Sequence, residues 1–157
     1  MTDSSKDLNN DYKRALNYAL RLLSAREYSR FELLSKLKAK FTYDVSLQVL
    51  KTCDEYNYVS DSRCAQMLIN HMQSCHYGPT RLFMESRKRR INDDVVKDLI
   101  EDVDWLSLAC ELLDRKIKDF PKTPNERNKI LSFLYRRGFS AGICYKALEI
   151  VKSKFLD

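Results

Sequence analysis

The sequence predicts an all-α protein in which three tandem three-helix repeats form an elongated, curved array. Its 157 residues include only 3 glycines and 3 prolines, fewer than the turns of a sheet protein usually use. Apolar residues make up 44% of the chain and charged residues 32%, a composition that can bury a core and is not typical of disorder. Apolar side chains also recur every three to four residues along most of the chain, as the buried face of a helix requires.

The first repeat is expected over residues 11–58, after a disordered polar tail over residues 1–10. Ser29 is expected to cap its second helix, because Glu32 follows three residues later, as in a capping box. The apolar positions of its three helices are Ala15, Leu16, Ala19, Leu20, Leu22 and Leu23; Phe31, Leu33, Leu34, Leu37 and Phe41; and Val45, Leu47, Val49 and Leu50.

The second repeat is expected over residues 59–103, with the same layout. Pro79 indicates the start of its second helix, because a missing N–H group costs nothing in the first helical turn. The apolar positions of its helices are Ala65, Met67, Leu68, Ile69 and Met72; Leu82, Phe83 and Met84; and Val95, Val96, Leu99 and Ile100.

The third repeat is expected over residues 104–157. Its first two helices are separated by the longest clear connection, residues 120–125, and Gly138 is a natural C-cap for the second helix. The apolar positions are Trp105, Leu108, Ala109, Leu112, Leu113 and Ile117; Ile130, Leu131, Phe133 and Leu134; and Phe139, Ile143, Ala147, Leu148 and Val151.

The three segments share one register, with a period of roughly 48–50 residues. Phe41, Ile91 and Phe139 occupy one equivalent position, and Val45, Val95 and Ile143 occupy the next. Because a three-helix unit of this size buries little surface alone, stacked repeats would bury the faces that each leaves open. The alternative is a single compact helical bundle with accidental internal similarity.

Cations gather near the end of the second helix in every repeat. They are Lys36, Lys38 and Lys40 in the first repeat, Arg87, Lys88, Arg89 and Arg90 in the second, and Arg136 and Arg137 in the third. The dipole at a helix C-terminus favours each cation by about 0.3–1 kcal/mol, so one or two per helix need no partner.

The second repeat exceeds that need. Between Arg81 and Arg90, five cations stand against the single acid Glu85, which leaves a net charge of +4 in a chain whose total is +6. We therefore expect Arg81 and the block 87–90 to form the central contact with an anionic partner, and the cations of the other two repeats to form outer contacts. A merely solvated helix face is the alternative.

Catalytic and metal-binding patterns are weak. The acids between Asp93 and Asp104 fall on several helix faces, whereas a metal-dependent nuclease would cluster them. His71 and Cys75 have the spacing of one helix face but lack a third and fourth metal ligand. No glycine-rich phosphate loop and no nucleophile–base pair occurs in the sequence. We therefore expect no enzyme activity, no metal site and no cofactor.

The compartment is expected to be the cytoplasm. The first residues, MTDSSKDLNNDYKR, are polar and lack the apolar stretch of a signal peptide, and no apolar run approaches the ~20 residues that span a bilayer. The five cysteines form no CxxC pair and mostly lie among apolar helical neighbours, so reduced thiols are expected.

Four segments, in the same order and spacing, resemble the RecX family of bacterial regulators of the RecA recombinase. They are ALRLLSAREYSR at 19–30 with Glu32-Leu33 and Lys36-Leu37, YVSDSRCA at 58–65, YGPTRL at 77–82, and RRGFS at 136–140. Asn57 and Arg90 stand where the family usually has glycine, so a side chain replaces a residue that adopts positive φ without strain. Ser60 and Cys64 also depart from the family pattern, replacing an acid and a phenylalanine.

The resemblance implies three tandem three-helix repeats and a non-enzymatic protein that docks along the RecA–single-stranded DNA filament. There it would cap or destabilise the filament and lower ATP hydrolysis, strand exchange and co-protease activity, in recombination and the SOS response. A monomer is expected. The resembling segments also indicate residues at the repeat junctions, which are Tyr58, Asp61, Arg63, Tyr77 and Gly78.

The main alternative function is a helix-turn-helix regulator that binds one duplex DNA site. Residues 28–50 can be drawn as a short helix, a tight turn and a basic helix. Asn and Gln, which read base edges, are sparse on the basic helices, and this disfavours the alternative.

Overall fold

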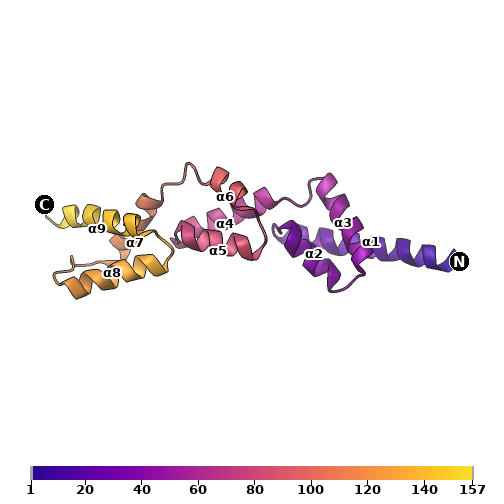
Figure 1. Ribbon diagram of the computed structural model, residues 1–157, viewed down its shortest axis with the longest axis horizontal. Helices are drawn as coiled ribbons and strands as arrows, with labels where there is room; N and C mark the ends of the chain where they lie inside the picture. Colours follow the sequence, from indigo (N-terminus) through magenta and orange to yellow (C-terminus); the bar gives the residue numbers. More distant parts are fainter. Residues whose placement is uncertain (1, 157) are drawn as a thin grey trace. The chain divides into compact units, whose positions relative to one another are not determined.

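The structure, a computed structural model, describes residues 2–156 of the chain and the side chains of residues 5–156. Within that range it contains nine α-helices and no strand (Figure 1). The helices are α1 (Thr2–Ala25), α2 (Arg30–Lys38), α3 (Tyr43–Glu55), α4 (Asp61–Cys75), α5 (Pro79–Lys88), α6 (Asp93–Leu99), α7 (Trp105–Lys116), α8 (Pro124–Arg136) and α9 (Ala141–Phe155). The predicted all-α class and its three three-helix repeats, α1–α3, α4–α6 and α7–α9, are confirmed.

Helix α1 begins earlier than the sequence indicated. It starts at Thr2, so the disordered tail predicted over residues 1–10 is corrected to helix, except for Met1, which lies outside the described residues. The side chains from Ser5 to Asn10 are exposed. The chain has neither glycine nor proline before Gly78. No helix-breaking residue therefore separates these exposed residues from the packed part of α1, and the helix continues through them.

The chain forms two compact units. The N-terminal unit comprises the described residues up to Met67 together with Arg87–Val96, and the C-terminal unit comprises Leu68–Ser86 together with the residues from Lys97 onward. The middle repeat, α4–α6, therefore contributes chain to both units. None of the helices in the described range is long and apolar enough to cross a lipid bilayer.

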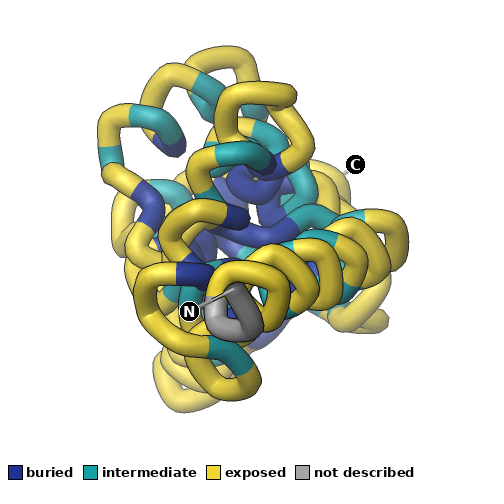
Figure 2. Tube along the Cα trace, turned by 90° about the vertical axis from the view of Figure 1, so that its right-hand side faces the viewer, coloured by how far each residue is buried: buried dark blue, intermediate teal, exposed yellow. Residues whose placement is uncertain are grey.

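Each unit has its own apolar core. The core of the N-terminal unit contains Ala15, Ala19, Tyr28, Leu33, Leu37, Val45, Val49, Cys53 and Val59. A core of the C-terminal unit contains Ala109, Cys110, Leu113, Leu134, Phe139, Cys144, Ala147 and Val151. Buried and exposed residues alternate along the helices (Figure 2). Each fully buried leucine stabilises its unit by about 1.5–3 kcal/mol relative to an exposed one.

Helix ends follow the predicted signals. Ser29 Oγ accepts the Glu32 amide at 3.1 Å, and the Glu32 carboxylate accepts the Ser29 amide at 3.1 Å, which confirms the capping box. Helix α5 begins at Pro79, and Gly138 follows the end of α8 with a φ of +98°, as a C-capping glycine does. A second capping box, Thr123 with Glu126, carries the same sequence signal and was not predicted.

Three residues other than glycine adopt left-handed backbone conformations. They are Asn57, His76 and Arg90, with φ values of 58°, 56° and 56°. Asn57 and Arg90 are two of the positions at which the RecX-like pattern usually has glycine, so the turns keep their geometry despite the side chain. For a residue with a Cβ atom this conformation costs roughly 1–2 kcal/mol, and asparagine tolerates it best.

We therefore expect Arg90→Gly to raise the free energy of unfolding by about 0.5–1 kcal/mol relative to Arg90→Ala, because glycine relieves the strain and alanine keeps it. Both variants remove the same side chain, so the comparison isolates the backbone. Urea unfolding monitored by far-UV circular dichroism measures the difference. Equal stability of the two variants would contradict the assigned strain.

The C-terminal unit contains a close approach of two backbones at Gly78 and Gly138. The Gly78 amide donates to the Arg137 carbonyl at 2.8 Å, and the Thr80 amide donates to the Gly138 carbonyl at 3.0 Å. A Cβ atom at Gly78 would overlap the Gly138 carbonyl and come within 2.5 Å of the Phe139 amide nitrogen. Only glycine fits at this position.

Gly78→Ala should therefore destabilise the C-terminal unit by roughly 1–3 kcal/mol, because backbone atoms cannot move aside as a side chain can. Gly142→Ala is the matched control, since a Cβ there meets nothing within 4 Å inside helix α9. Because Gly142 is the second residue of α9, where the helix-interior cost of glycine applies only in part, this variant should be neutral or should stabilise by less than about 1 kcal/mol. Thermal unfolding of both variants tests the pair, and a neutral Gly78→Ala would show that the close approach is not required.

Candidate partner interface

The Glu32 carboxylate joins the first repeat to the second within the N-terminal unit. Besides the Ser29 amide, it accepts a hydrogen bond from Arg26 Nη2 at 3.1 Å, and Arg89 Nε lies 3.5 Å from Glu32 Oε1. Ser29 Oγ in turn donates to the Arg89 carbonyl at 2.8 Å. Arg89, expected to contact a partner, is thus anchored to the start of α2 through both its backbone and its side chain.

Burial alone would raise the pKa of Glu32, but the Ser29 amide and the charges of Arg26 and Arg89 outweigh it and lower that pKa below its ordinary value. The pKa of Cys64, in contrast, is raised. Its Sγ lies 3.7 Å from Glu32 Oε1. Burial, together with the negative charge of Glu32, raises the pKa of Cys64 to about 12. The carboxylate therefore stays ionised and the neighbouring thiol stays protonated near neutral pH.

Two of the predicted junction residues, Asp61 and Arg63, also link the first repeat to α4. The Asp61 carboxylate accepts the Arg30 amide at 2.8 Å. Arg63 donates to the Glu27 carboxylate at 3.1 Å and to the Asn57 carbonyl at 2.8 Å. Asp61 thus caps the start of α2, and Arg63 stabilises the turn that precedes α4.

Tyr58, also predicted at a repeat junction, lies in the turn between α3 and α4. Its side chain stays 45% exposed, and its ring stacks on that of Tyr56 with centroids 5.6 Å apart and planes 18° from parallel. Val59, the next residue, is the one that enters the core.

The junction in the C-terminal unit is built around the ring of Tyr77. The guanidinium of Arg81 lies 3.8 Å from the ring centroid and that of Arg137 lies 4.0 Å from it. Arg137 also donates to the carbonyls of Cys75 and His76 at the end of α4. Arg81 and Arg137, both expected to contact a partner, are therefore partly buried in cation–π and capping contacts.

The remaining predicted cations are exposed. They are Lys36, Lys38, Lys40, Arg87, Lys88, Arg90 and Arg136. Arg87 pairs with Asp93 at 2.8 Å, and this hydrogen bond raises the pKa of the guanidinium. Arg90 lies over the ring of Phe31 at 5.6 Å, and Lys40 lies over the ring of Tyr18 at 4.4 Å. These residues keep their charge available to solvent.

Sequence reasoning missed the role of Glu32 beyond its cap, and with it the part played by Arg26. The capping-box spacing identifies the glutamate, but no spacing could assign it Arg26 and Arg89 together, because the two arginines are far apart in the chain. Among the described residues, no group of three or more His, Cys, Asp or Glu side chains is placed to hold a metal ion.

Glu32→Gln should lower the free energy of unfolding of the N-terminal unit by about 1–3 kcal/mol near neutral pH, because a neutral amide cannot pair with both arginines. Since the pKa of Glu32 is lowered by folding, its contribution is present above the ordinary carboxyl pKa and is lost as pH falls through the folded value. Chemical unfolding at a series of acidic pH values should show a smaller loss of stability in the variant. Parallel curves for variant and parent would contradict this role.

The fold and its surface define an all-α repeat protein with exposed cations near the ends of its second helices. Residues 15–53 match the first three-helix domain of RecX, and residues 102–148 match the third three-helix domain of RecX. The regulatory protein RecX of Legionella pneumophila (strain Corby) is 33% identical over 149 residues, which cover 91% of this chain and 98% of that protein. The RecX of Haemophilus influenzae (strain PittEE) is 31% identical over 131 residues, covering 80% and 86%.

The chain therefore belongs to the RecX family of regulatory proteins. The crystal structure of RecX from Lactobacillus salivarius has the same fold, with a TM-score of 0.78 and 22% identity over 92% of this chain and 98% of that one.

Proposed function

We propose that this protein regulates a RecA recombinase filament on single-stranded DNA by binding to it, and that binding lowers the filament's ATPase, strand-exchange and co-protease activities. The relatives named regulatory protein RecX support a regulatory role. The exposed cations support a partner that presents carboxylates or phosphates. The proposed action occurs in the cytoplasm, by a monomer, and requires neither catalysis nor a cofactor from this chain.

The proposal rests on residues 88–90, where one anchored arginine stands between two exposed cations. Arg89 is anchored by Glu32 and Ser29, while its neighbours Lys88 and Arg90 are exposed. An anchored backbone loses less conformational entropy when its neighbours bind, so the two cations are presented in advance. This refines the expected central contact: Lys88 and Arg90 make it, and Arg89 positions them.

The outer contacts are proposed at the exposed cations of the other repeats. Lys36, Lys38 and Lys40 lie at the end of α2 and beyond it, and Arg136 closes α8. Exposed cations gain little individually, but several contacts to a charged polymer sum to a binding that weakens as salt rises.

The helix-turn-helix alternative is less well supported. Helix α3 would have to enter the major groove, yet it carries Asp44, Asp54 and Glu55 against Lys51. A helix with a net charge of −2 is repelled by the phosphates on both sides of that groove.

The double variant Lys88→Glu/Arg90→Glu should require roughly tenfold more protein for half-inhibition of DNA-dependent ATP hydrolysis by RecA. The reason is that two attractive charges become repulsive at the proposed contact. Co-sedimentation with RecA filaments at two salt concentrations measures the same loss directly.

Lys13→Glu/Lys51→Glu is the matched control, because it changes the net charge equally at exposed cations outside the proposed interface. It should inhibit as the parent does. If the folded Lys88→Glu/Arg90→Glu variant inhibited fully, or if both double variants lost inhibition equally, the proposed contact would be wrong.

A further inference from the structure

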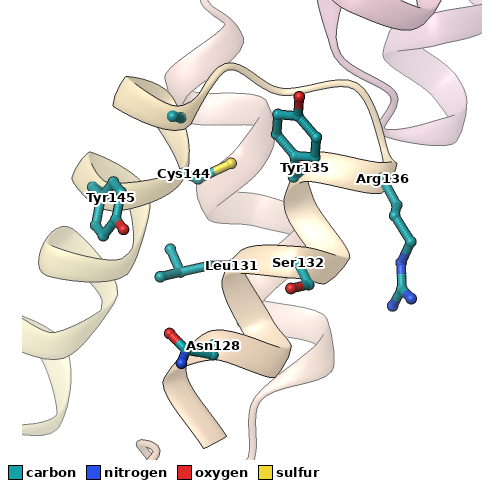
Figure 3. A pocket seen from close by; sticks show the side chains of 8 residues that line it. Asn128, Leu131, Ser132, Tyr135, Arg136, Cys144 and Tyr145 are labelled. Carbon is teal, nitrogen blue, oxygen red and sulfur yellow. The ribbon is translucent and has the colours of Figure 1, made fainter. Parts of the chain in front are cut away.

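A groove of about 700 Å³ lies between helices α8 and α9 in the C-terminal unit (Figure 3). Asn128, Leu131 and Tyr135 line it from one face of α8, and Cys144 and Tyr145 line it from α9. Cys144 is buried and Leu131 is half-buried, so the groove has an apolar floor. None of the binding residues proposed above lines it, apart from Arg136 at its rim.

Two tyrosines flank this floor with most of their surface in solvent. Tyr135 is 68% exposed and Tyr145 is 61% exposed, and Figure 3 shows Leu131 and Cys144 projecting between them. Tyrosine can shield its ring by packing and expose only its hydroxyl. Two rings left in solvent on either side of an apolar floor instead offer flat aromatic surfaces to a ligand.

Helices α8 and α9 carry a net positive charge that favours an anionic ligand, although Lys154 is paired with Asp114 and Arg137 lies on the ring of Tyr77. The stretch 124–155 carries seven Lys and Arg residues against two acids, Glu126 and Glu149, a net charge of +5 in a chain with +6 overall. The lining residues include one cation, Arg136, and no acid.

Exposed aromatic rings combined with cations are the features that bind single-stranded nucleic acid. Bases stack on the rings and phosphates pair with the cations, and the binding tolerates any sequence because every base has a π face. An acidic peptide would use the cations but would leave the tyrosine rings without stacking partners. The amide of Asn128 adds a hydrogen-bonding group at the edge of the apolar floor.

We propose that the α8–α9 groove is a nucleobase-binding site that holds an unpaired nucleotide of single-stranded nucleic acid. Its base stacks on Tyr135 or Tyr145 above Leu131 and Cys144, and an adjacent phosphate pairs with Arg136. This binding needs no RecA, so it stands apart from the filament regulation proposed above.

The test uses the full-length protein without RecA, with a fluorescently labelled oligodeoxythymidine and an abasic oligomer of the same length and charge. Fluorescence anisotropy should show tighter binding to the oligomer that has bases. The double variant Tyr135→Ala/Tyr145→Ala should weaken oligodeoxythymidine binding by roughly 5- to 150-fold, and at least one of the single variants Tyr135→Ala and Tyr145→Ala should do the same. None of these variants should change abasic binding or the salt dependence, because the phosphate contacts remain.

Matched variants separate stacking from folding and from charge. Tyr135→Phe and Tyr145→Phe should retain the preference for bases, because the ring is kept. Tyr56→Ala removes a ring that is 66% exposed in the N-terminal unit and should leave binding unchanged. Lys88→Glu/Arg90→Glu should also keep the preference for bases, which distinguishes failure of this site from failure of the filament contact.

Equal affinity for the two oligomers would overturn the proposal, as would tyrosine-to-alanine variants that bind oligodeoxythymidine like the parent. Variants that keep oligodeoxythymidine affinity but lose co-sedimentation with RecA filaments would assign the groove to a protein partner instead. Binding to the abasic oligomer as tight as to oligodeoxythymidine, with a steep salt dependence, would reduce the surface to phosphate attraction alone.

Discussion

The ionised carboxylate of Glu32 is the group on which the N-terminal unit depends. It caps helix α2, as its position in the sequence indicates. Its oxygens also interact with Arg26 and Arg89, which come from different segments of the chain. A half-buried carboxylate is stable only while such partners are present. The cap of one helix thereby also binds a segment of the second repeat, residues 87–96, which belongs to the same unit.

In the C-terminal unit, different interactions join one repeat to the next. Two glycine backbones approach closely, and the ring of Tyr77 lies beside two guanidiniums, one of which also caps the end of α4. In both units, polar groups at helix ends join one repeat to the next, while apolar residues fill the cores. Short repeats cannot supply enough apolar surface at every junction, so directional bonds between helix ends add to it.

Because arginines are used at these junctions, the cation clusters have two roles that the sequence pattern does not separate. Arg81, Arg89 and Arg137 stabilise junctions, and Lys88, Arg90 and Arg136 next to them face solvent. An anchored arginine positions its exposed neighbour at little entropic cost. The proposed filament contact and the proposed nucleobase site both use this arrangement, one beside Glu32 and the other beside two exposed tyrosines.

The sequence alone determined the local features of this protein. Helical periodicity, the Ser29 cap, Pro79 and Gly138 are read correctly because each depends on residues within about one helical turn. Tertiary structure alone decided which cations are partly buried, since Glu32 pairs with Arg89 rather than with its neighbours through contacts between distant segments. It also decided that Tyr135 and Tyr145 flank one groove, because the separation of two residues on successive helices does not specify which faces of those helices meet.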